Sequence, residues 1–287
     1  MAVGEVIWTW FNEGWQQGNV AVMGAADHGT WLGTLVFDGA RAFDGLTPDL
    51  EPHMQRVNNS ARALGMEPTK SAAEMVALVK EGLKKFAPNA PVYIRPMYWS
   101  TEGARGVIVP DPDSTAFALC LEQLPMAPAD AAQRLCRTQF VRPMLSMATV
   151  NAKAACLYPN NARMIREAQA KGFDNALVAD VLGNVAESAT ANVFMVRDGV
   201  VKTPVPNGTF LNGITRQRVI KLLRADGYEV VETTLSFADF EAADEVFLSG
   251  NISKITPIVA FEDTEYPIGP VTRRARDLYW DWARSEG

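Results

Sequence analysis

Two blocks of alternating strands and amphipathic helices make up most of this 287-residue chain, and a stretch with two prolines separates them. Helical spacing of apolar residues predicts helices over 50–64, 71–86, 158–171 and 215–225. Ser71, followed by Glu74 at the capping-box offset, marks the start of the second helix. Helices and strands that alternate in both blocks favour an α+β fold with two domains.

Short segments rich in β-branched and aromatic residues predict the strands between these helices. Strands are expected at 20–24, 35–43, 91–99, 115–121, 175–180, 192–197, 229–234 and 244–248. Pro125 and Pro128 lie in a stretch without periodicity, so residues 123–132 are interpreted as an interdomain linker. The expected domains are a small N-terminal domain over 1–122 and a large C-terminal domain over 133–287.

Composition excludes several classes of protein. Hydrophobic residues make up 48% of the chain and charged residues 21%, which is typical of a folded globular protein. The net charge of −6 argues against non-specific nucleic-acid binding, which needs a basic surface. No run approaches the ~20 apolar residues that span a bilayer. We therefore expect a protein that acts on small molecules, with neither a nucleic-acid nor a membrane partner.

The cysteines and histidines argue against disulfides and metal. Three cysteines are scattered without a CxxC pair, which is typical of reduced thiols. The chain has only two histidines, His28 and His53, so a histidine-based metal site is not expected. The first residues lack the basic start and apolar core of a secretory signal. These features together predict a cytoplasmic protein without a metal.

A lysine stands where a charge is unexpected. Lys153 lies in the small and apolar run 149–158, and a buried ammonium is costly unless it is paired or deprotonated. A deprotonated lysine is nucleophilic and can form a Schiff base with an aldehyde. Thirty-four residues later, Glu187 is again a lone carboxylate among small residues. A lysine and a carboxylate are the two charges that pyridoxal phosphate most needs, one for its aldehyde and one for its ring nitrogen.

Three further features could hold the phosphate of that cofactor. Gly213, Ile214 and Thr215 lead into the helix over 215–225, and a helix start offers N–H donors to an anion. The turn around Asn251 is a second source of N–H groups, and Arg56 is a candidate cation. Each has an ordinary alternative, namely a capped helix, a strand connection and a surface arginine.

Taken together, these segments resemble the class IV pyridoxal-phosphate aminotransferases, the group that contains the branched-chain and D-amino acid aminotransferases. The resemblance covers nearly the whole chain and rests on the order and spacing of segments 185–187, 192–194, 213–216 and 243–247. It implies PLP fold type IV, with the active site between the two domains. It also implies a homodimer, in which a loop from the other subunit closes over the substrate.

The resemblance implies a role for each candidate residue. Lys153 looks like the Schiff-base lysine and catalytic residue, Tyr158 like the partner of the cofactor's phenolic oxygen, and Glu187 like the partner of its ring nitrogen. The remaining cofactor contacts are expected from Arg56, Leu211, Gly213, Ile214, Thr215 and Asn251.

Substrate contacts are expected from Trp31, Phe37, Arg95, Trp99 and Arg105. Segments 37–41 and 93–96 look like the branched-chain enzymes, whereas 98–106 and 250–252 depart from their pattern. Such departures are similar to those in (R)-selective amine transaminases, in which a mobile arginine accepts the carboxylate of the keto acid. Arg105 is the candidate for that arginine, and its alternative is a solvent-facing loop charge.

The reaction expected from the resemblance is a ping-pong transamination that moves an amino group from an amino acid or amine to pyruvate or 2-oxoglutarate. Alternatives are an (R)-selective amine:pyruvate transaminase, a D-amino acid aminotransferase, an aminodeoxychorismate lyase, or a non-catalytic binding protein that keeps the fold. The sequence does not set the donor, its stereochemistry or the keto acid.

Overall fold

The computed structural model describes residue 4 and residues 6–286 and divides the chain into two compact units. Unit 1 comprises the residues up to Met126 together with Asn151–Cys156. Unit 2 comprises Ala127–Val150 and Leu157–Ser285. The short segment around Lys153 therefore belongs to unit 1, whereas the sequence assigned it to a second domain over 133–287.

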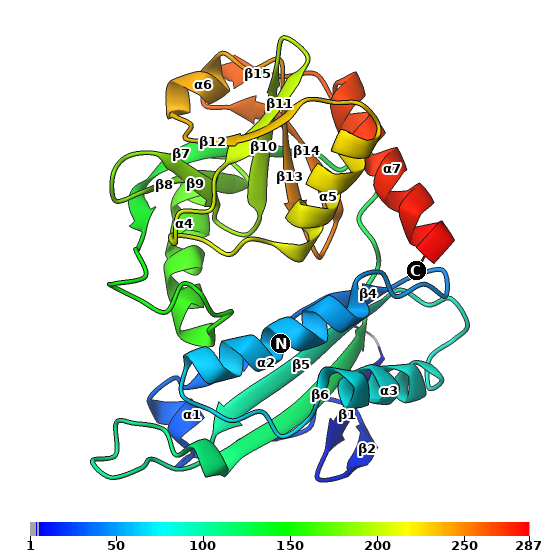
Figure 1. Ribbon diagram of the computed structural model, residues 1–287, viewed down its shortest axis with the longest axis vertical. Coiled ribbons are helices and arrows are strands. Elements are labelled where there is room, and N and C mark those ends of the chain that lie inside the picture. Colours follow the sequence, from blue (N-terminus) through cyan, green and yellow to red (C-terminus); the bar gives the residue numbers. More distant parts are fainter. Residues whose placement is uncertain (1–3, 5, 287) are drawn as a thin grey trace. The chain divides into compact units, whose positions relative to one another are not determined.

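Unit 1 is built on an antiparallel sheet of six strands in the order β2-β1-β6-β5-β3, with β4 also paired to β5 (Figure 1). Its strands are β1 (Ile7–Phe11), β2 (Gly14–Gln17), β3 (Leu35–Phe37), β4 (Ala40–Ala42), β5 (Val92–Ser100) and β6 (Thr115–Gln123). Its helices are α1 (His28–Trp31), α2 (Leu50–Ala63) and α3 (Ala72–Leu83), and it also contains the 3-10 turn η1 (Pro112–Ser114). A second 3-10 turn, η2 (Ala155–Leu157), begins in unit 1 and ends at the first residue of the next segment of unit 2.

Helices α2 and α3 cover one face of this sheet (Figure 1). Helix α2 buries Met54 and Val57, and α3 buries Met75 and Val79, which gives each helix an apolar stripe toward the strands. The predicted capping box is confirmed, because Ser71 and Glu74 exchange both side-chain to backbone hydrogen bonds at the start of α3.

One strand prediction in unit 1 is wrong, and another is met by an interrupted strand. Residues 20–24 form neither helix nor strand, because no neighbouring strand pairs with them and their side chains stay at least partly exposed. The expected strand over 35–43 is present as β3 and β4, which both pair with β5 in one continuous register. Asp38 lies between them, and its buried carboxylate accepts a hydrogen bond from the Gly39 N–H.

Unit 2 is built on a mixed sheet of nine strands in the order β12-β11-β10-β13-β14-β7-β8-β9, with β15 paired to β14. Its strands are β7 (Gln133–Arg142), β8 (Asn175–Asp180), β9 (Val185–Ser188), β10 (Asn192–Arg197), β11 (Val200–Pro204), β12 (Val230–Thr233), β13 (Glu245–Gly250), β14 (Lys254–Phe261) and β15 (Thr264–Glu265). Its helices are α4 (Tyr158–Ala170), α5 (Ile214–Ala225), α6 (Phe237–Glu241) and α7 (Pro270–Glu286).

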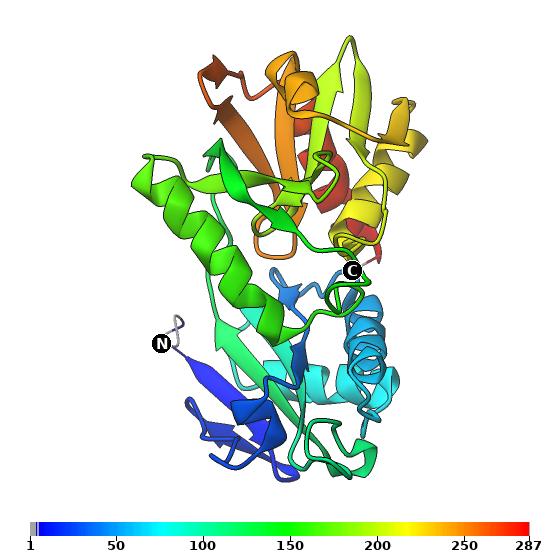
Figure 2. The ribbon, with the colours of Figure 1, turned by 90° about the vertical axis from the view of Figure 1, so that its left-hand side faces the viewer.

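The two faces of the unit 2 sheet bury different cores. One face carries a cluster that includes Leu135, Leu177, Val193 and Leu248. On the other face, α4 packs against β7 and β8 through Met164, and α5 packs against β13 (Figure 2). Strands β9 and β10 contact each other near the turn that joins them, although they are not paired neighbours in the strand order.

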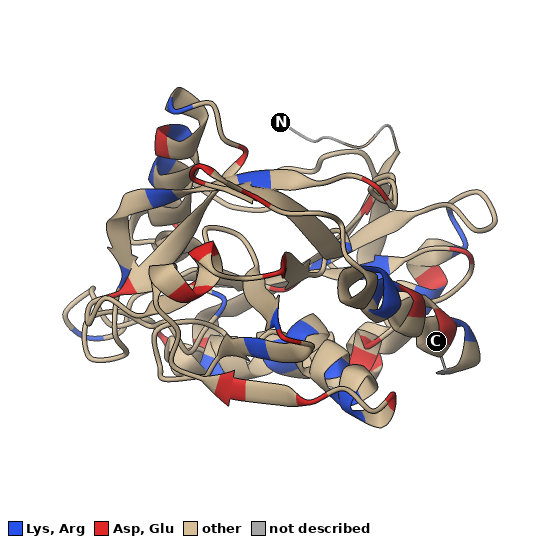
Figure 3. Cartoon of the chain, turned by 90° about the horizontal axis from the view of Figure 1, so that it is seen from above, with Lys and Arg blue, Asp and Glu red and all other residues tan. Residues whose placement is uncertain are grey.

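Charged residues of both signs are interspersed along the helices and loops (Figure 3). Some neighbouring charges of opposite sign form ion pairs, for example Lys171 with Glu167 and Arg274 with Asp226. Among the described residues, no helix is both long and apolar enough to cross a membrane. The three cysteines are all free thiols.

Candidate active site

The backbone of Lys153 is hydrogen-bonded to two other segments of unit 1. The carbonyl oxygen of Lys153 accepts a hydrogen bond from the N–H of Phe37 over 3.1 Å, and its own N–H donates to Oγ of Ser60 over 3.1 Å. The next residue, Ala154, forms a β-bridge with Val36. These contacts fix the main chain from which the lysine side chain projects.

The side chain of Lys153 is half-buried, between two residues that are fully buried. Ala152 and Ala154 are 1% and 0% exposed. The ammonium nitrogen lies 5.0 Å from the ring centre of Phe37, close enough for a cation–π contact. The predicted burial of this run therefore holds for Ala152 and Ala154, whereas Asn151, Cys156 and Tyr158 are exposed.

Arg56 is held by a carboxylate that sequence reasoning missed. Asp38 accepts hydrogen bonds from Nε and Nη2 of Arg56 over 2.6 and 2.8 Å, and Nδ1 of His53 lies 2.8 Å from Oδ1. Asp38 and His53 are buried, whereas Arg56 is 21% exposed. Asp38 therefore fixes the direction of a guanidinium that still reaches the surface of unit 1.

The pKa of Asp38 reflects this arrangement. Burial alone would raise the pKa, but the charges and hydrogen bonds of Arg56 and His53 outweigh it and hold the pKa well below its usual range. Asp38 is consequently an anion at neutral pH and a permanent partner for Arg56.

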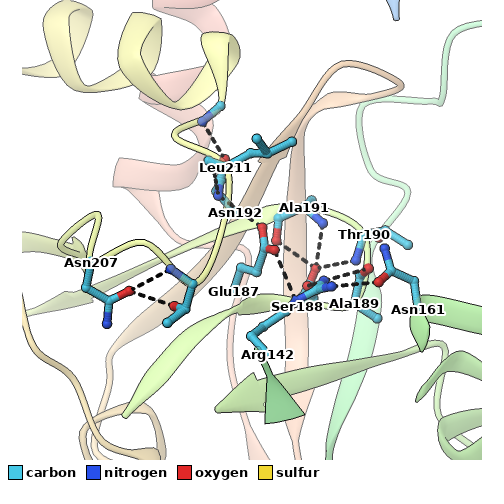
Figure 4. A network of polar contacts seen from close by, with 12 residues as sticks. Arg142, Asn161, Glu187, Ser188, Ala189, Thr190, Ala191, Asn192, Asn207 and Leu211 are labelled. Carbon is cyan, nitrogen blue, oxygen red and sulfur yellow. Dashed lines mark hydrogen bonds and ion pairs between the residues drawn. The ribbon is translucent and has the colours of Figure 1, made fainter. Parts of the chain in front are cut away.

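Glu187, on β9, is held by two side chains of unit 2 (Figure 4). Nε of Arg142 lies 3.1 Å from Oε1, which makes an ion pair although its N–H does not point at that oxygen. Nδ2 of Asn192 donates to Oε2 over 3.2 Å. The Glu187 side chain is 14% exposed, so it is largely enclosed and its carboxylate is held in place by these partners.

Arg142 is itself oriented by the turn after β9. Its Nη2 donates to the carbonyl oxygens of Ser188 and Ala189, each over 3.0 Å, and its Nη1 donates to Oδ1 of Asn161 over 2.6 Å. Sequence reasoning missed this residue, because Arg142 and Glu187 are 45 positions apart and no local motif joins them. The strand that carries it, β7, was not predicted either, so no signal in the sequence pointed to this residue.

Asn192 connects Glu187 to the start of α5. Its Nδ2 also donates to the carbonyl oxygen of Leu211 over 3.0 Å, and its Oδ1 accepts from the N–H of Gly213 over 3.2 Å (Figure 4). A Cβ atom at position 213 would lie 2.2 Å from that Oδ1, so any other residue would displace the Asn192 amide. Segment 192–194 was recognised in the sequence, but the role of Asn192 was not.

The first turn of α5 is a candidate anion site. Gly213 is the N-cap residue and has no side chain with which to bond the N–H groups of the first turn. Ile214 and Thr215 begin the helix, and Thr215 is buried. Such a helix start presents N–H donors and the positive end of the helix dipole.

The turn after β13 reaches the same neighbourhood. Ser249 lies directly opposite Asn192 in the β10–β13 pairing, and Asn251 follows two residues later. Directly opposed residues share one face of a sheet, so the side chains of Ser249 and Asn192 are neighbours. The structure thus brings together four predicted cofactor contacts of unit 2, namely Glu187, Leu211, Gly213 and the turn at Asn251.

The other predicted residues are placed as follows. Tyr158 begins α4 and is 38% exposed. Nη2 of Arg95 donates to Oε2 of Glu122 over 2.8 Å. Trp31 is 57% exposed and lines a cavity of about 460 Å³ in unit 1, and Arg105 lies in the exposed loop beside it.

Trp99, which was predicted to contact the substrate, is packed inside unit 1. Trp99 is 1% exposed, and its Nε1 donates to Oδ2 of Asp27 over 3.0 Å. Its ring also packs near that of Phe11. Trp99 is therefore part of the core of unit 1, and its bulk supports the position of the segment that carries Asp27. Among the described residues, no group of three histidine, cysteine or acidic residues could hold a metal ion.

Comparison with known proteins gives consistent results. The sequence model of the family described as amino-transferase class IV matches residues 35–261. The branched-chain-amino-acid aminotransferase of Escherichia coli K12 is 32% identical over 289 residues, which cover 94% of this chain and 91% of that protein.

Two solved structures are also similar. An aminotransferase from Brucella abortus bound to PLP shares 61% identity with a TM-score of 0.96, over 98% of this chain and 100% of the other. A branched-chain aminotransferase from Thermoproteus uzoniensis with norvaline shares 26% identity with a TM-score of 0.89, over 98% of this chain and 96% of the other.

Proposed function

Because this chain belongs to the class IV aminotransferase family, whose members use pyridoxal phosphate, we propose that it transfers the amino group of a branched-chain amino acid to a keto acid. The acceptor is pyruvate or 2-oxoglutarate, and the two half-reactions follow a ping-pong order. The branched-chain donor is proposed from the E. coli relative and from the branched-chain-like segments 37–41 and 93–96.

One observation carries the proposal. A carboxylate held by an arginine and an asparagine stands beside a helix start whose N-cap is glycine, and Asn192 bonds to both. The donor set fits pyridoxal phosphate, because Glu187 matches the ring nitrogen and the start of α5 matches the phosphate. When bound, this cofactor supplies a ring that withdraws electrons from the substrate carbon.

Lys153 is the proposed anchor and proton carrier. Its Nζ would hold the cofactor by its aldehyde carbon until the donor's amine takes that place. The freed Nζ would then serve as the base and acid that carries the substrate proton. The bonds to Phe37 and Ser60 support this role, because they hold the lysine's main chain still while its side chain changes partner.

The other cofactor contacts have supporting roles. Tyr158 donates to the cofactor's phenolic oxygen, Leu211 packs against its ring, and Arg56 adds a cation to the phosphate contacts of Ile214, Thr215 and Asn251. Support for Arg56 comes from the buried Asp38 behind it, which presents the guanidinium in one orientation. Glu187 would pair with the ring nitrogen, and a carboxylate there favours the protonated form of that nitrogen.

Substrate contacts are proposed from unit 1. Phe37 supplies an apolar surface next to Lys153, and Arg95 supplies a cation for a carboxylate, with Glu122 fixing its orientation. Trp31 and Arg105, both exposed, are the remaining candidates.

We further propose a homodimer in the cytoplasm. Val107, Ile108 and Val109 are 52%, 69% and 60% exposed in one loop of unit 1, and a second copy of the chain would cover such a loop. The three free thiols are consistent with a reducing compartment. Light scattering coupled to size-exclusion chromatography measures the assembly.

An activity screen tests the proposed reaction. Purified protein with pyridoxal phosphate is given leucine, D-alanine or (R)-1-phenylethylamine as donor, each with pyruvate and with 2-oxoglutarate. We expect the highest kcat/KM with leucine. Turnover of (R)-1-phenylethylamine with pyruvate, without turnover of leucine, would replace the branched-chain assignment by an amine transaminase. No turnover of any pair would contradict the proposed function itself.

A further inference from the structure

A fully buried lysine lies beside the candidate phosphate turn. Lys254 is 1% exposed at the start of β14, directly opposite Gly250 in the β13–β14 pairing. Its φ of +61° is in the left-handed region, which a non-glycine residue adopts only where its surroundings hold it. Its Nζ donates to Oδ1 of Asn251 over 2.8 Å.

This hydrogen bond fixes which way the Asn251 amide points. An ammonium has donors only, so the side-chain atom that faces Lys254 must be the oxygen of the amide. The amide nitrogen is then directed away from Lys254. That Nδ2 atom is buried and has no hydrogen-bond partner among the residues that the structure describes.

The hydroxyl group of Ser249 is a second buried donor without a hydrogen-bond partner among the described residues. The residue as a whole is 1% exposed. Ser249 lies opposite Asn192, whose Oδ1 holds the N–H of Gly213 at the start of α5. Buried polar groups are nearly always bonded, so two such donors next to one helix start indicate a bound acceptor.

We propose that Lys254 is a positioning residue, which turns the Asn251 amide nitrogen toward the phosphate of the cofactor. This inference rests on the proposed function and adds to it. The contact that matters to the phosphate is a side-chain donor, Nδ2 of Asn251, and the ammonium behind it selects the orientation and adds positive charge on the same side. The alternative is that Lys254 only ties the turn together.

The test compares binding of two ligands to the apo protein. Pyridoxal phosphate and pyridoxal differ only by the phosphate, and both are followed by the absorbance change on binding. In Lys254→Met, the Kd for pyridoxal phosphate should rise about tenfold or more, because a hydrogen bond to a charged group is weakened, while the Kd for pyridoxal should stay within about twofold. Lys221→Met removes an exposed lysine from α5 and should change neither.

A purely structural role predicts a different result. If Lys254 only ties the turn, Lys254→Met lowers Tm and weakens both ligands alike, or leaves both unchanged, and either result overturns the inference. Wild-type apo protein that binds neither ligand would instead contradict the proposed function.

Variants of Asn251 keep the test decisive if Lys254→Met does not fold. Asn251→Asp keeps an oxygen for Lys254 and replaces the donor by an anion, so pyridoxal phosphate should bind about 100-fold more weakly and pyridoxal about as before. Equal binding of pyridoxal phosphate by Asn251→Asp and wild type would show that Nδ2 does not face the phosphate.

Discussion

Asn192 donates to Oε2 of Glu187 over 3.2 Å and accepts, through Oδ1, from the N–H of Gly213. One amide side chain therefore sets the distance between a carboxylate on β9 and the first residues of α5. In the proposed function these two features hold opposite ends of one small molecule. Asn192 thus links the residue proposed to contact the cofactor's ring to the helix start proposed to contact its phosphate.

Replacing Asn192 should release both the Glu187 carboxylate and the start of α5 from their fixed positions. Asn192→Ala removes the bonds to Glu187, Leu211 and Gly213 and leaves their partners buried, so the free energy of unfolding should fall by about 2 to 3 kcal/mol. We expect kcat to fall about tenfold, because the carboxylate and the helix start are no longer aligned. Urea unfolding and steady-state kinetics measure the two effects. The control is Asn184→Ala, whose side chain makes one long 3.5 Å contact with Asp180.

Removing the charge of Glu187 should slow the chemistry more than it weakens binding. Glu187→Gln keeps an oxygen for Asn192 but no longer keeps the ring nitrogen protonated, so kcat should fall by about 10²-fold or more. Cofactor affinity should change much less. Single-turnover kinetics with leucine measure the rate, and Glu229→Gln, an exposed glutamate of unit 2, is the matched control. A kcat equal to that of wild type would remove Glu187 from its proposed role.

Removing the amine of Lys153 should abolish covalent attachment. Lys153→Ala should lose the absorbance band of the lysine-bound cofactor and at least about 10³-fold of the turnover, because both the covalent link and the proton carrier are gone. Borohydride reduction followed by peptide mass spectrometry should find the cofactor on Lys153 in wild type and on no lysine in the variant. Lys84→Ala, an exposed lysine of unit 1, should behave as wild type. Full turnover by Lys153→Ala would exclude the proposed mechanism.

The stability of unit 1 should depend on pH through Asp38. Its pKa is held below the unfolded value of about 3.9, so its contribution is present at neutral pH and is lost as the pH falls below about 4. The free energy of unfolding of wild type should exceed that of Asp38→Asn by on the order of 2 kcal/mol at pH 7, and the difference should shrink toward pH 3. Urea unfolding at several pH values measures this.

The matched control for that experiment is Asp44→Asn, which removes an exposed carboxylate of the same unit at a position where asparagine also tolerates the positive φ of 51°. Its stability should follow that of wild type at every pH. A constant difference between wild type and Asp38→Asn from pH 7 to pH 3 would show that Asp38 does not titrate as described.

Local signals in the sequence predicted local structure well. The helix expected over 50–64 is present as α2, Leu50–Ala63. Its signals are local, because the apolar residues repeat every three or four positions and Gly65, with its positive φ, follows directly after the helix. The hairpin of β1 and β2 was missed, although Asn12 and Glu13 both have positive φ at its turn. Asparagine at such a position is a recognisable signal for a two-residue turn.

Contacts between distant positions could not be predicted in the same way. Trp99 was expected at the substrate because it is bulky, but the sequence does not show its hydrogen bond to Asp27, 72 positions away. The partners of Glu187 were missed for the same reason, since Arg142 lies on a strand that pairs with β8 and not with β9. A sequence shows residue types and their spacing, whereas contacts such as Trp99–Asp27 and Arg142–Glu187 depend on the order of the strands in the folded sheet.

The placement of Asn151–Cys156 has a consequence for how this protein can be divided. The chain passes between the units after Met126, after Val150, after Cys156 and again after Ser285, so no single cut yields two complete pieces. A fragment over 133–287 would contain both Lys153 and Glu187, yet Ala154 would lose its bridge to Val36 and Lys153 its bonds to Phe37 and Ser60. Lys153 thus belongs to unit 1 although it lies within the stretch of sequence that mostly encodes unit 2, and a fragment over 133–287 would separate it from the contacts that hold its main chain.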